Sequence, residues 1–550
     1  MQKTLKSIIL GTCLALSPFL PTSKASAAQE FVRGDVDGNG KITLTDPINT
    51  LNYLFKGGAK PECEDAMDVN DDGKVDLGDA VYSLGYLFKG GSVPERPFPE
   101  KGYDLKRDDL GCKGEGDLGG FFEIRQSDIP LIITSGGTQR DPAVYLLLED
   151  IVAKETAISV LGAHYVNLDG NGQTITIIGG DAGISFDNSH GSILKNTHIV
   201  SQRESEDKNA LVSLKLNDFY EGIVTNNIFE SEGDNLPAVL ITSSKRNHFD
   251  YNQIKTLGTG SPAVLVSLSS NNFFKENQIE TFEENSHGFE SIGSQSYLLR
   301  NSITTEGRDS SGIFFSRYFD AFSKYNELAN NNIITFGENA PGIFLSSSSH
   351  NLFYQDSVET RGQKSHGIEF MLGGLTSTSS TQNKFEFVRI YAYGSESYGL
   401  DFKLGNHEDN VLSDSEIGGE KSDVHFSRGG SLKLNNVLLS KEKLDFDPMS
   451  EAKVYRSWYL AATVSDLTGP LENALVKLYD SKGSLLPSQI TGIDGNIPRQ
   501  NLISYTQDKN GIVTVSPYRI KIEKEKYVSQ EKTFDFTNNM NLEFVLEGEE

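Results

Sequence analysis

Two acidic loops carry the residues in this sequence whose types and spacing are best suited to binding a metal ion. Residues 35–46 (DVDGNGKITLTD) and 68–79 (DVNDDGKVDLGD) are two copies of one pattern, 33 residues apart. Each copy has oxygen-bearing side chains at loop positions one, three and five, a glycine at six and an aspartate at twelve. Calcium takes about six to eight oxygen ligands, and the glycine allows the sharp turn that gathers them. The sequence therefore predicts two Ca²⁺ sites.

The predicted ligands stand at loop positions one, three, five, seven and twelve, where position seven supplies its backbone carbonyl. Each loop is followed by a nearly identical tail, LNYLFKGG at 51–58 and LGYLFKGG at 84–91, so the whole unit is duplicated. We expect Asp76 to reach the second ion through a water molecule. The direct ligands predicted for the first and then the second ion are Asp35, Asp37, Asn39, Lys41 and Asp46, and Asp68, Asn70, Asp72, Lys74 and Asp79.

The order of this unit is loop–helix, loop–helix, because too few residues precede Asp35 in the expected mature chain to form a leading helix. That order resembles the dockerin modules of cellulosomal enzymes, and residues 28–113 are the expected module. The resemblance implies calcium binding and raises a cohesin-like or cell-surface partner as an expectation. The chain departs from the family at the partner-reading positions ten and eleven, which are Leu44–Thr45 and Leu77–Gly78 and not paired hydroxyls. The module is also N-terminal here, whereas dockerins usually end a chain.

The first 27 residues are typical of a secretory signal peptide. Lys3 and Lys6 precede an apolar run at 8–20, and a small-residue cleavage site follows at 25–27. The run is too short to span a membrane, and no later stretch of the sequence is long and apolar enough. We therefore expect a secreted or cell-surface protein with no transmembrane segment.

Charge and cysteine content narrow the possible partners and the compartment. Removing the expected signal peptide takes away three lysines and no acidic residue, so the formal net charge falls from −26 to −29. This excess of negative charge disfavours nucleic acid and anionic membranes as partners. Two cysteines remain, Cys63 and Cys112, both in the calcium unit. An even pair in a secreted segment with little core predicts a disulfide, and the alternative is two free thiols.

From about residue 182 to 426 the sequence repeats, mostly every 24 or 25 residues, with two longer steps of 30–32. In each repeat a short segment alternates apolar and polar residues, as a strand with one buried face does. Stacked parallel strands produce such columns, whereas a propeller blade needs nearly twice this period and a leucine-rich repeat shows helical spacing. The residues predicted to point inward are Val239/Ile241, Val264/Val266, Ile313/Phe315, Ile343/Leu345, Ile368/Phe370, Leu400/Phe402 and Val424/Phe426.

A second strand in each repeat keeps the same register. Apolar columns that include Phe249 and Ile254 recur in successive repeats, and asparagine columns that include Asn247 and Asn252 accompany them. Asparagine tolerates the left-handed backbone of a tight turn, and its side-chain amide can bond the amide of the next repeat. We predict a parallel β-helix over residues 120–452. It resembles the right-handed β-helix family that includes pectate lyases and other polysaccharide-active proteins.

Beyond residue 451 the period ends, and short strands between turn signals predict a small antiparallel β-sandwich over residues 455–550. The segments 469–483 and 491–495 resemble the carboxypeptidase-regulatory, transthyretin-like family, which implies a spacing or binding role. The predicted fold class is mainly β. A right-handed parallel β-helix is preceded by a small α-helical module of dockerin or EF-hand type and followed by a β-sandwich.

One outward-facing column of the β-helix is the candidate for chemistry. Because stacked strands lie about 4.8 Å apart, Glu369 and Asp401 would stand at the carboxylate separation of a retaining glycosidase. His425 or the nearby Lys403 would act as a base or charge partner, and the phenyl rings would cover sugar rings. The alternative is that these acids are solvated surface groups. The predicted catalytic residues are Glu369, Asp401 and His425, and the predicted substrate-binding residues are Phe314 and Phe344.

Two hypotheses of function remain open. In the first, the β-helix binds and degrades an extracellular polysaccharide, as a polysaccharide lyase or glycoside hydrolase would, and the calcium module attaches it to a scaffold or surface. In the second, the chain is a non-enzymatic surface protein in which the β-helix is a stiff spacer. Resemblance in fold does not choose between them, because function depends on the site.

Overall fold

The computed structural model describes residues 31–99, 101, 110, 112, 121–202, 212–318, 321–373 and 379–549. The chain divides into two compact units, Met1–Phe122 and Glu123–Glu550, and each is described by itself. The expected signal peptide lies outside the described residues. Among the described residues, no helix combines the length and the apolar character needed to cross a bilayer.

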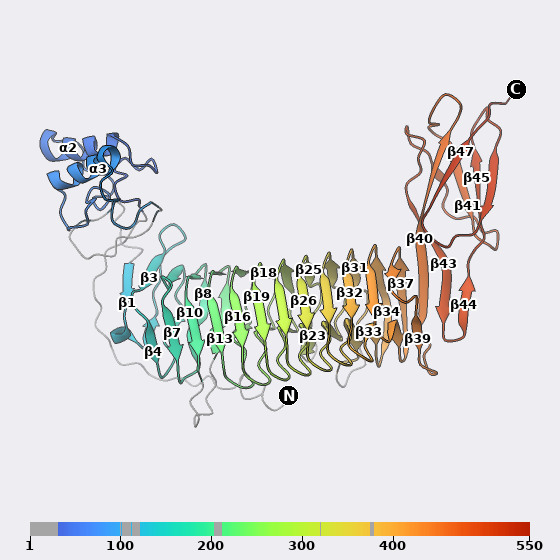
Figure 1. The fold of residues 1–550 in the computed structure, drawn as a ribbon, viewed down its shortest axis with the longest axis horizontal. Coiled ribbons are helices and arrows are strands. Elements are labelled where there is room, and N and C mark those ends of the chain that lie inside the picture. Colours follow the sequence, from blue (N-terminus) through green and yellow to red (C-terminus); the bar gives the residue numbers. More distant parts are fainter. Residues whose placement is uncertain are drawn as a thin grey trace. The chain divides into compact units, whose positions relative to one another are not determined.

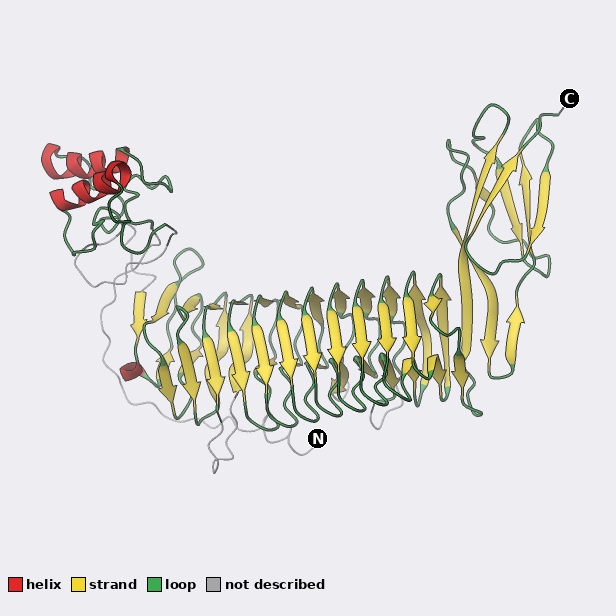
Figure 2. Ribbon diagram, in the orientation of Figure 1, coloured by secondary structure: helices red, strands yellow, loops and turns green. Residues whose placement is uncertain are grey.

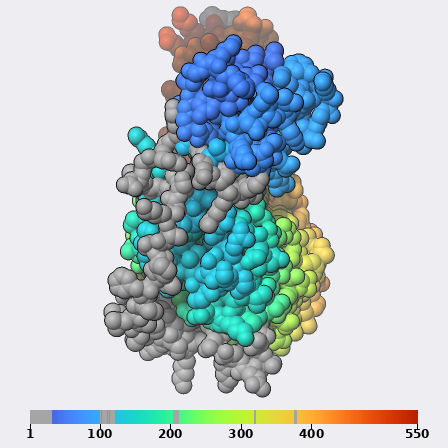
Figure 3. All heavy atoms as spheres, turned by 90° about the vertical axis from the view of Figure 1, so that its left-hand side faces the viewer, coloured from blue at the N-terminus to red at the C-terminus, as the bar shows by residue number. Residues whose placement is uncertain are grey.

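The first unit contains the two predicted loop–helix repeats, whose helices are red in Figure 2. Helix α2 spans Thr45–Lys56 and helix α3 spans Leu77–Lys89. Each helix ends at a glycine in the left-handed conformation, Gly57 or Gly90, which a residue with a side chain adopts less readily. The described residues of the unit are the blue spheres of Figure 3.

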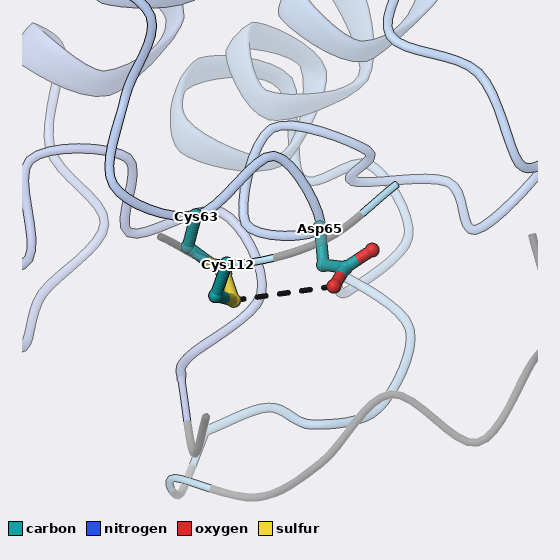
Figure 4. Close-up of side chains that lie close together, drawn as sticks. All are labelled: Cys63, Asp65 and Cys112. Carbon is teal, nitrogen blue, oxygen red and sulfur yellow. Dashed lines mark hydrogen bonds between the residues drawn. A yellow bond between two sulfur atoms is a disulfide. The ribbon is translucent and has the colours of Figure 1, made fainter. Parts of the chain in front are cut away.

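A disulfide and a buried arginine stabilise this unit, whose cluster of buried apolar side chains is small. Cys63 and Cys112 are bonded as predicted, across 49 residues of chain (Figure 4). Such a crosslink stabilises mainly by restricting the unfolded chain. Arg33 is fully buried, donates to the Asp68 carbonyl at 2.6 Å and forms an ion pair with Asp71 at 3.2 Å. A buried guanidinium requires such partners, so Arg33 ties the start of the module to its second loop.

The second unit begins with a parallel β-helix, as predicted, built from rungs that contribute one strand to each of three sheets (Figure 1). The short 3-10 helix η1, Gln126–Asp128, lies in the first rung. The first sheet carries the candidate column on its outward face. The short strand β24 (Ala321–Phe322) pairs antiparallel with β23 (Ile313–Tyr318) of this sheet. The strands of the first sheet are β2 Leu131–Ile133, β5 Ile158–Leu161, β8 Ala182–His190, β11 Val212–Tyr220, β14 Val239–Thr242, β17 Val264–Ser267, β20 Phe289–Ile292, β23 Ile313–Tyr318, β27 Ile343–Ser346, β30 Ile368–Met371, β33 Tyr398–Phe402, β36 Ser422–Phe426 and β39 Leu444–Phe446.

The second and third sheets follow the first along each rung. Within the β-helix the strands of the second sheet are β1 Phe121–Ile124, β3 Ala143–Leu147, β6 Val166–Asp169, β9 Ile193–Lys195, β12 Ile223–Thr225, β15 His248–Asp250, β18 Asn272–Lys275, β21 Ser296–Leu299, β25 Glu327–Ala329, β28 Leu352–Tyr354, β31 Lys384–Glu386, β34 Asn406–Ser413 and β37 Gly429–Asn435. Those of the third sheet are β4 Ile151–Ala153, β7 Thr174–Ile177, β10 His198–Ser201, β13 Ile228–Ser231, β16 Gln253–Thr256, β19 Gln278–Thr281, β22 Ser302–Thr305, β26 Asn332–Thr335, β29 Ser357–Thr360, β32 Arg389–Ala392, β35 Glu416–Gly419 and β38 Leu438–Leu439.

The core of the β-helix consists of the predicted inward columns. Val239 and Ile241 are fully buried, and the corresponding pairs of the later rungs, through Val424 and Phe426, are at most 1% exposed. Aromatic rings in this core stack from rung to rung, as Phe370 does on Phe402 at 4.2 Å between centroids. The register pairs Val239 with Val264 and Ile368 with Leu400, so each column continues unbroken through the two longer steps.

Asparagine ladders link the rungs at the turns that flank the second sheet, as predicted. Asn252 donates its side-chain Nδ2 to Oδ1 of Asn277 at 3.0 Å and to the Val224 carbonyl at 2.8 Å. The backbone N–H of Asn252 donates to the same Asn277 oxygen. Asn247 and Asn272 repeat this geometry at the other turn. Polar groups of buried turns are thereby satisfied, which the interior requires.

The ladder that begins at Asn227 ends at Asp356, where an acid replaces the asparagine. Asp356 Oδ1 accepts from both the backbone and the side chain of Asn331, but its buried Oδ2 has no hydrogen-bond partner among the described residues. Asparagines of this ladder use the equivalent atom to donate to a carbonyl of the preceding rung, as Asn331 does to Leu298. Burial raises the pKa of Asp356 from 3.8 to about 7, so the protonated acid can take over that donor role.

Beyond the last rungs, β40 (Lys453–Ser465) joins the β-helix to the C-terminal segment. It pairs parallel with β37 and antiparallel with β43 (Gln500–Asp508), which pairs with β44 (Gly511–Thr514). The other sheet has β42 (Gln489–Ile490), β41 (Leu475–Tyr479), β45 (Tyr518–Glu523) and β46 (Gln530–Phe534). Both sheets contribute to one buried cluster of apolar side chains. The resemblance to the carboxypeptidase-regulatory family stays a prediction.

The expectation of a purely antiparallel C-terminal unit is wrong at one strand pair. β40 and β47 (Met540–Val545) run parallel, with Leu460 opposite Met540. Between them the chain passes through the other sheet and returns, and such a crossover permits parallel neighbours, whereas the sequence pattern shows only alternation.

We expect Asp356→Asn to stabilise the β-helix, and to do so only when the solution is not acidic. Because the folded chain holds the Asp356 proton up to a pH of about 7, the wild type loses stability as pH rises from 3.8 to about 7. Asparagine removes this loss, so the variant should gain about 2 kcal/mol at pH 8, the usual magnitude for a buried unsatisfied polar group, and almost nothing at pH 4. Thermal unfolding across this pH range measures it. The reverse substitution at another position of the same ladder, Asn301→Asp, should destabilise the β-helix at pH 8.

Candidate functional sites on the paired loops and on the β-helix

The two calcium loops have matching internal hydrogen bonds. In the first loop Asp35 accepts from the backbone N–H of Asn39 at 3.0 Å and of Gly40 at 2.7 Å. In the second loop Asp68 accepts from Asp72 at 3.1 Å and from Gly73 at 2.8 Å. These contacts fold each loop around the carboxylate at position one, and the glycine at position six has a left-handed φ of +83° in both.

The carboxylates at position twelve close the loops from the first turn of each helix. Asp46 accepts from the N–H of Val36 and of Thr43, and Asp79 accepts in the same way from Val69 and Asp76. Asp46 is fully buried and Asp79 is 1% exposed. Each loop therefore holds its first and last predicted ligands on one framework of backbone donors.

The first loop gathers three carboxylates into a space that suits a cation. One oxygen each from Asp35, Asp37 and Asp46 lies within 4.8 Å of the others. Burial, followed by the neighbouring carboxylates, raises the pKa of Asp35, and burial together with Asp68 raises that of Asp79 to about 6. Crowded buried anions of this kind need a positive charge, and a hard cation with oxygen ligands fits them.

The remaining predicted ligands have different surroundings. Asn39 and Asn70 face their own loops, where Asn39 accepts from the N–H of Lys41 and Asn70 from that of Asp72. Lys74 at position seven likewise donates its N–H to Asp72. Asp76 is the N-cap of α3 and accepts from the N–H of Gly78 at 2.6 Å. A helix cap thus accounts for Asp76, and its water-mediated contact with calcium stays a prediction.

The outward column of the first sheet has the predicted register. Phe314 lies opposite Phe344, Phe344 opposite Glu369, Glu369 opposite Asp401 and Asp401 opposite His425. The sequence could not show how far these side chains reach solvent. Glu369 is 3% exposed and Asp401 2%, so neither acid is the solvated surface group of the alternative reading.

Asp401 lies between two histidines. His425 Nδ1 is 2.6 Å from Asp401 Oδ1, and His366 Nε2 is 3.1 Å from Asp401 Oδ2. His366 Nδ1 accepts the backbone N–H of Tyr398, so its proton sits on Nε2 and is donated to Asp401. Burial lowers the pKa of His366 to about 4, which keeps this imidazole neutral. Asp401 thus accepts N–H groups from both rings.

His425 is the more accessible of the two imidazoles. Its side chain is 12% exposed, and its Nε2 points to the exposed carboxylate of Asp447 at 3.4 Å. Burial alone would lower the pKa of His425, but the hydrogen bond and charge of Asp401, aided by Asp447, outweigh burial and raise it. Because Asp401 holds the proton on Nδ1, the neutral ring presents the lone pair of Nε2 outward, as a general base requires.

Lys403 completes the group of five side chains that we call the charged cluster: His366, Glu369, Asp401, Lys403 and His425. Lys403 Nζ lies 2.8 Å from Glu369 Oε1 and 3.9 Å from Asp401 Oδ2. Burial raises the pKa of Glu369 to about 7, while the ammonium of Lys403 opposes that shift. Lys403 is 32% exposed, so Lys403 and His425, and not the two acids, are the members that a ligand reaches first.

The charged cluster contains a set of possible metal ligands, but a cation already stands there. Ligand atoms of His366, Glu369 and Asp401 lie within 4.8 Å of one another. The Lys403 ammonium contacts both acids of this set, and His366 directs an N–H toward Asp401. Both are donors, which favours a network of ion pairs and hydrogen bonds over metal coordination. A second group of possible metal ligands, Cys63, Asp65 and Cys112 (Figure 4), is not available for coordination, because the disulfide uses both sulfurs.

The predicted sugar-binding rings stack on each other. Phe314 lies between His287, at 4.6 Å, and Phe344, at 4.9 Å, with planes within about 11°. Both faces of Phe314 and one face of Phe344 are therefore covered by rings of neighbouring rungs. A sugar at Phe314 would meet the edge of the ring and not the faces that stacking requires, and at Phe344 the Phe314 ring takes one of the two faces. The binding role of these two residues stays a prediction.

His366 and Tyr398 are the members of the site that the outward column did not include. Each stands three residues before an acid: His366 lies just ahead of β30 and precedes Glu369, and Tyr398 is the first residue of β33 and precedes Asp401. The two lie in register, and their rings stack at 5.2 Å; Tyr398 also stacks on His425 at 4.3 Å. The signal was present in the segments HGIEF and YGLDF, which place a ring at the same position of successive rungs.

Comparison with known families decides the nature of the first unit. The dockerin type I domain family matches residues 33–82. Residues 33–82 are a dockerin type I domain. The match contains all the predicted calcium ligands, and dockerin type I domains bind calcium and imply a cohesin partner. No curated protein matches the sequence.

Several solved structures resemble the β-helix at low identity. The mannuronan C-5 epimerase AlgE4 A-module of Azotobacter vinelandii is 12% identical, with 60% of this chain and 89% of that one covered and a TM-score of 0.34. A GH87 α-1,3-glucanase of Streptomyces thermodiastaticus is 10% identical, with 63% of this chain and 73% of that one covered and a TM-score of 0.34. An exopolygalacturonase of Thermotoga maritima is 12% identical, with 59% of this chain and 85% of that one covered and a TM-score of 0.28. Likeness at this level carries no argument about reaction or substrate.

Removing calcium should unfold the dockerin domain and leave the β-helix folded. Without the ions the crowded carboxylates of each loop repel one another, and the unit has little apolar core to oppose this. Addition of a chelator should abolish the α-helical circular dichroism of α2 and α3 while the high-temperature transition of the β-helix stays unchanged. Asp46→Ala combined with Asp79→Ala should reproduce this result, and Glu95→Ala, an exposed acid of the same unit outside the ligand set, serves as the control. Loss of the β-helix signal together with the helical signal after chelation would contradict this prediction.

Proposed function

We propose that this chain is a secreted protein whose β-helix binds and cleaves an extracellular polysaccharide, while the dockerin domain attaches it to a scaffold or surface. The observation that carries the proposal is the arrangement around Asp401. A buried carboxylate orients an accessible imidazole, and a lysine paired with a second buried carboxylate stands beside it. Side chains tuned in this way are typical of sites that transfer protons.

Within this site His425 acts as the general base. Its Nε2 takes a proton from an attacking water, or from the substrate carbon that loses hydrogen in an elimination, and Asp401 stabilises the imidazolium that results. As the bond to the glycosidic oxygen breaks, the imidazolium gives this proton to the departing oxygen. Asp401 is a positioning residue, because at 2% exposure it does not touch a polymer. Lys403 contacts the same carboxylate, so its ammonium lies near the reacting groups and stabilises the negative charge that develops. Glu369 in turn holds Lys403.

The module arrangement supports attachment outside the cell. We propose two Ca²⁺ ions, one in each loop, and export directed by the signal peptide at 1–27. The disulfide between Cys63 and Cys112 is consistent with an oxidising compartment. The C-terminal unit would act as a spacer or binding module of carboxypeptidase-regulatory type.

A non-enzymatic spacer is the second candidate, and one observation favours it. The two acids of the charged cluster are almost completely buried and fully paired, as a network that stabilises the last rungs would be. Together with the asparagine ladders this would make a stiff rod that holds the dockerin domain away from a surface.

Assays on a panel of polymers distinguish the enzyme from the spacer. Glucans, xylan, mannan, pectin, alginate and glycosaminoglycans are each incubated with the full chain, and reducing ends and unsaturated products are measured. His425→Ala and Lys403→Met should each lower the rate by about 10²–10⁴, the range for loss of acid–base or charge stabilisation. His350→Asn, an exposed histidine of the β-helix outside the cluster, should leave the rate unchanged.

The pH dependence tests the role of Asp401. With a raised pKa for His425, activity should rise with pH along a limb centred above 6.5, the ordinary value. Asp401→Asn removes the main partner that raises this pKa, so the limb should move to lower pH while the rate falls. A merely structural role for Asp401 would lower stability and leave the limb in place. No product from any polymer would refute the enzyme and leave the spacer.

Attachment would use the outer faces of the two dockerin helices. The two repeats expose the same three apolar positions, 33 residues apart: Leu44, Ile48 and Phe55, and Leu77, Val81 and Phe88, all at least 45% exposed. Exposed apolar side chains gathered in this way mark a protein-binding surface. We propose that this surface, in place of the paired hydroxyls of other dockerins, binds a cohesin.

Binding to an immobilised type I cohesin tests this surface. Because the repeats present equivalent residues, Ile48→Glu or Val81→Glu alone should weaken binding only slightly, whereas the double variant should abolish it. Val93→Glu, an exposed apolar position of the same domain outside both helices, serves as the matched control. Equal binding by the double variant and the wild type would show that the partner reads another surface.

A further inference from the structure

A groove runs along the corner of the β-helix where the second sheet turns into the third, on residues that the charged cluster does not use. Its volume is about 610 Å³. Five successive rungs supply the same turn position to its wall: Asn330, Gln355, Phe387, Asp414 and Asn436. At the usual strand spacing the groove is roughly 19 Å long. The rung spacing is close to the length of one pyranose unit in an extended chain, so each rung can present one side chain to one sugar.

At one end the lining offers unused hydrogen-bonding groups. Asn330 and Gln355 are exposed, and neither side-chain amide makes a hydrogen bond with any described residue. Each amide supplies two donors and an acceptor, the groups that bind sugar hydroxyls. They stand on adjacent rungs, which are joined here by a hydrogen bond from the backbone N–H of Asn330 to the Tyr354 carbonyl.

At the other end of the groove, hydrogen bonds within the protein hold the polar side chains in place before a ligand binds. Asp414 accepts from Nδ2 of Asn436 at 2.6 Å and from the hydroxyl of Tyr459 at 2.8 Å. Asn436 in turn accepts from Asn539 of the C-terminal unit at 2.7 Å. These bonds hold the carboxylate in one orientation, so it can accept from a ligand without first losing conformational freedom.

An exposed aromatic ring stands in the middle of the groove. Phe387 is 48% exposed and has a left-handed φ of +56°. Bulky residues rarely adopt this conformation, which Asn330 and Asn436 adopt readily at the equivalent position. An exposed phenyl ring thus occupies a position whose backbone conformation asparagine adopts more readily, and an edge-to-face contact with Tyr354 at 5.6 Å orients this ring. A ring among amides and carboxylates is the lining that binds the apolar face and the hydroxyls of a sugar.

The charges of the groove select among ligands. Asp414 and Glu416 outnumber the single cation, Arg389, whose Nε lies 4.0 Å from Glu416. The chain as a whole carries a formal net charge of −26. Both facts disfavour an anionic polymer and favour an uncharged one.

We propose that this groove is a second carbohydrate-binding site, which holds a neutral polysaccharide along the axis of the β-helix with one sugar ring on Phe387. The proposal rests on the polysaccharide-directed function proposed above but not on cleavage. The groove would hold the polymer on the chain while the charged cluster, on the first sheet, acts on it.

The test is binding of the full chain to soluble β-1,3-glucan, β-1,4-glucan, xylan and mannan, measured by affinity electrophoresis and calorimetry. Phe387→Asn should weaken binding about tenfold, the effect of losing a ring contact, and should raise the melting temperature because asparagine accepts the left-handed turn. Greater stability with weaker binding separates loss of a contact from loss of the fold. Asn330→Ala with Gln355→Ala should also weaken binding.

Phe336→Ala is the matched control, since Phe336 is a 41% exposed phenyl ring of the β-helix outside the groove. Phe336→Ala should leave affinity unchanged, and His425→Ala should slow cleavage by the factor given above while binding persists. Unchanged affinity in Phe387→Asn, with the wild type binding a polymer, would overturn the groove alone. A wild type that binds none of these neutral polymers would also overturn it, and a wild type that neither binds nor cleaves any polymer would overturn the polysaccharide function itself.

Discussion

Backbone hydrogen bonds between successive rungs hold the β-helix in one register, and the asparagine ladders lock that register at the turns. Asn252 illustrates the device, since one side chain bonds the rung before it and the rung after it. A slip of one residue would exchange the inward and outward faces of every strand. The charged cluster depends on this constraint directly, because Glu369, Asp401 and His425 meet only if three rungs are aligned. The groove depends on it as well, because its wall repeats one turn position.

Much of this architecture could be predicted from the sequence because the fold repeats. Columns such as Val239 to Val424 reveal themselves by their period, and the outward column was predicted with the register that the structure has. The calcium loops were predictable for a related reason, since metal coordination fixes the residue type at each loop position. The pairing of Cys63 with Cys112 could be predicted because the sequence has only these two cysteines outside the predicted signal peptide.

Other features could not be predicted, because they depend on what lies beside a column and not on the column itself. Alternation places Glu369 and Asp401 on the outward face, but their burial depends on Lys403, His366 and His425 around them. Period alone likewise gives no sign that Phe314 and Phe344 cover each other's faces. The groove at Phe387 was missed because a turn position shows no hydrophobic pattern.

Buried charge connects these sites to function. Two carboxylates that are at most 3% exposed are tolerated only because a lysine and two imidazoles surround them. The same arrangement gives His425 a fixed tautomer and an outward-facing lone pair, so one network both satisfies the interior and prepares a base. Among the described residues Asp356 has no such charged partner, and burial instead raises the pKa of its carboxyl to about 7, so the acid keeps its proton in acidic solution.

Whether the charged cluster is a polysaccharide site is tested most directly by nuclear magnetic resonance of the histidine side chains during titration with oligosaccharides. We predict that His425 titrates above 6.5, carries its proton on Nδ1 when neutral, and shifts on addition of an oligosaccharide from the polymer that is cleaved. We expect His366 to stay neutral throughout. A His425 signal that titrates normally and does not respond to any oligosaccharide would contradict it.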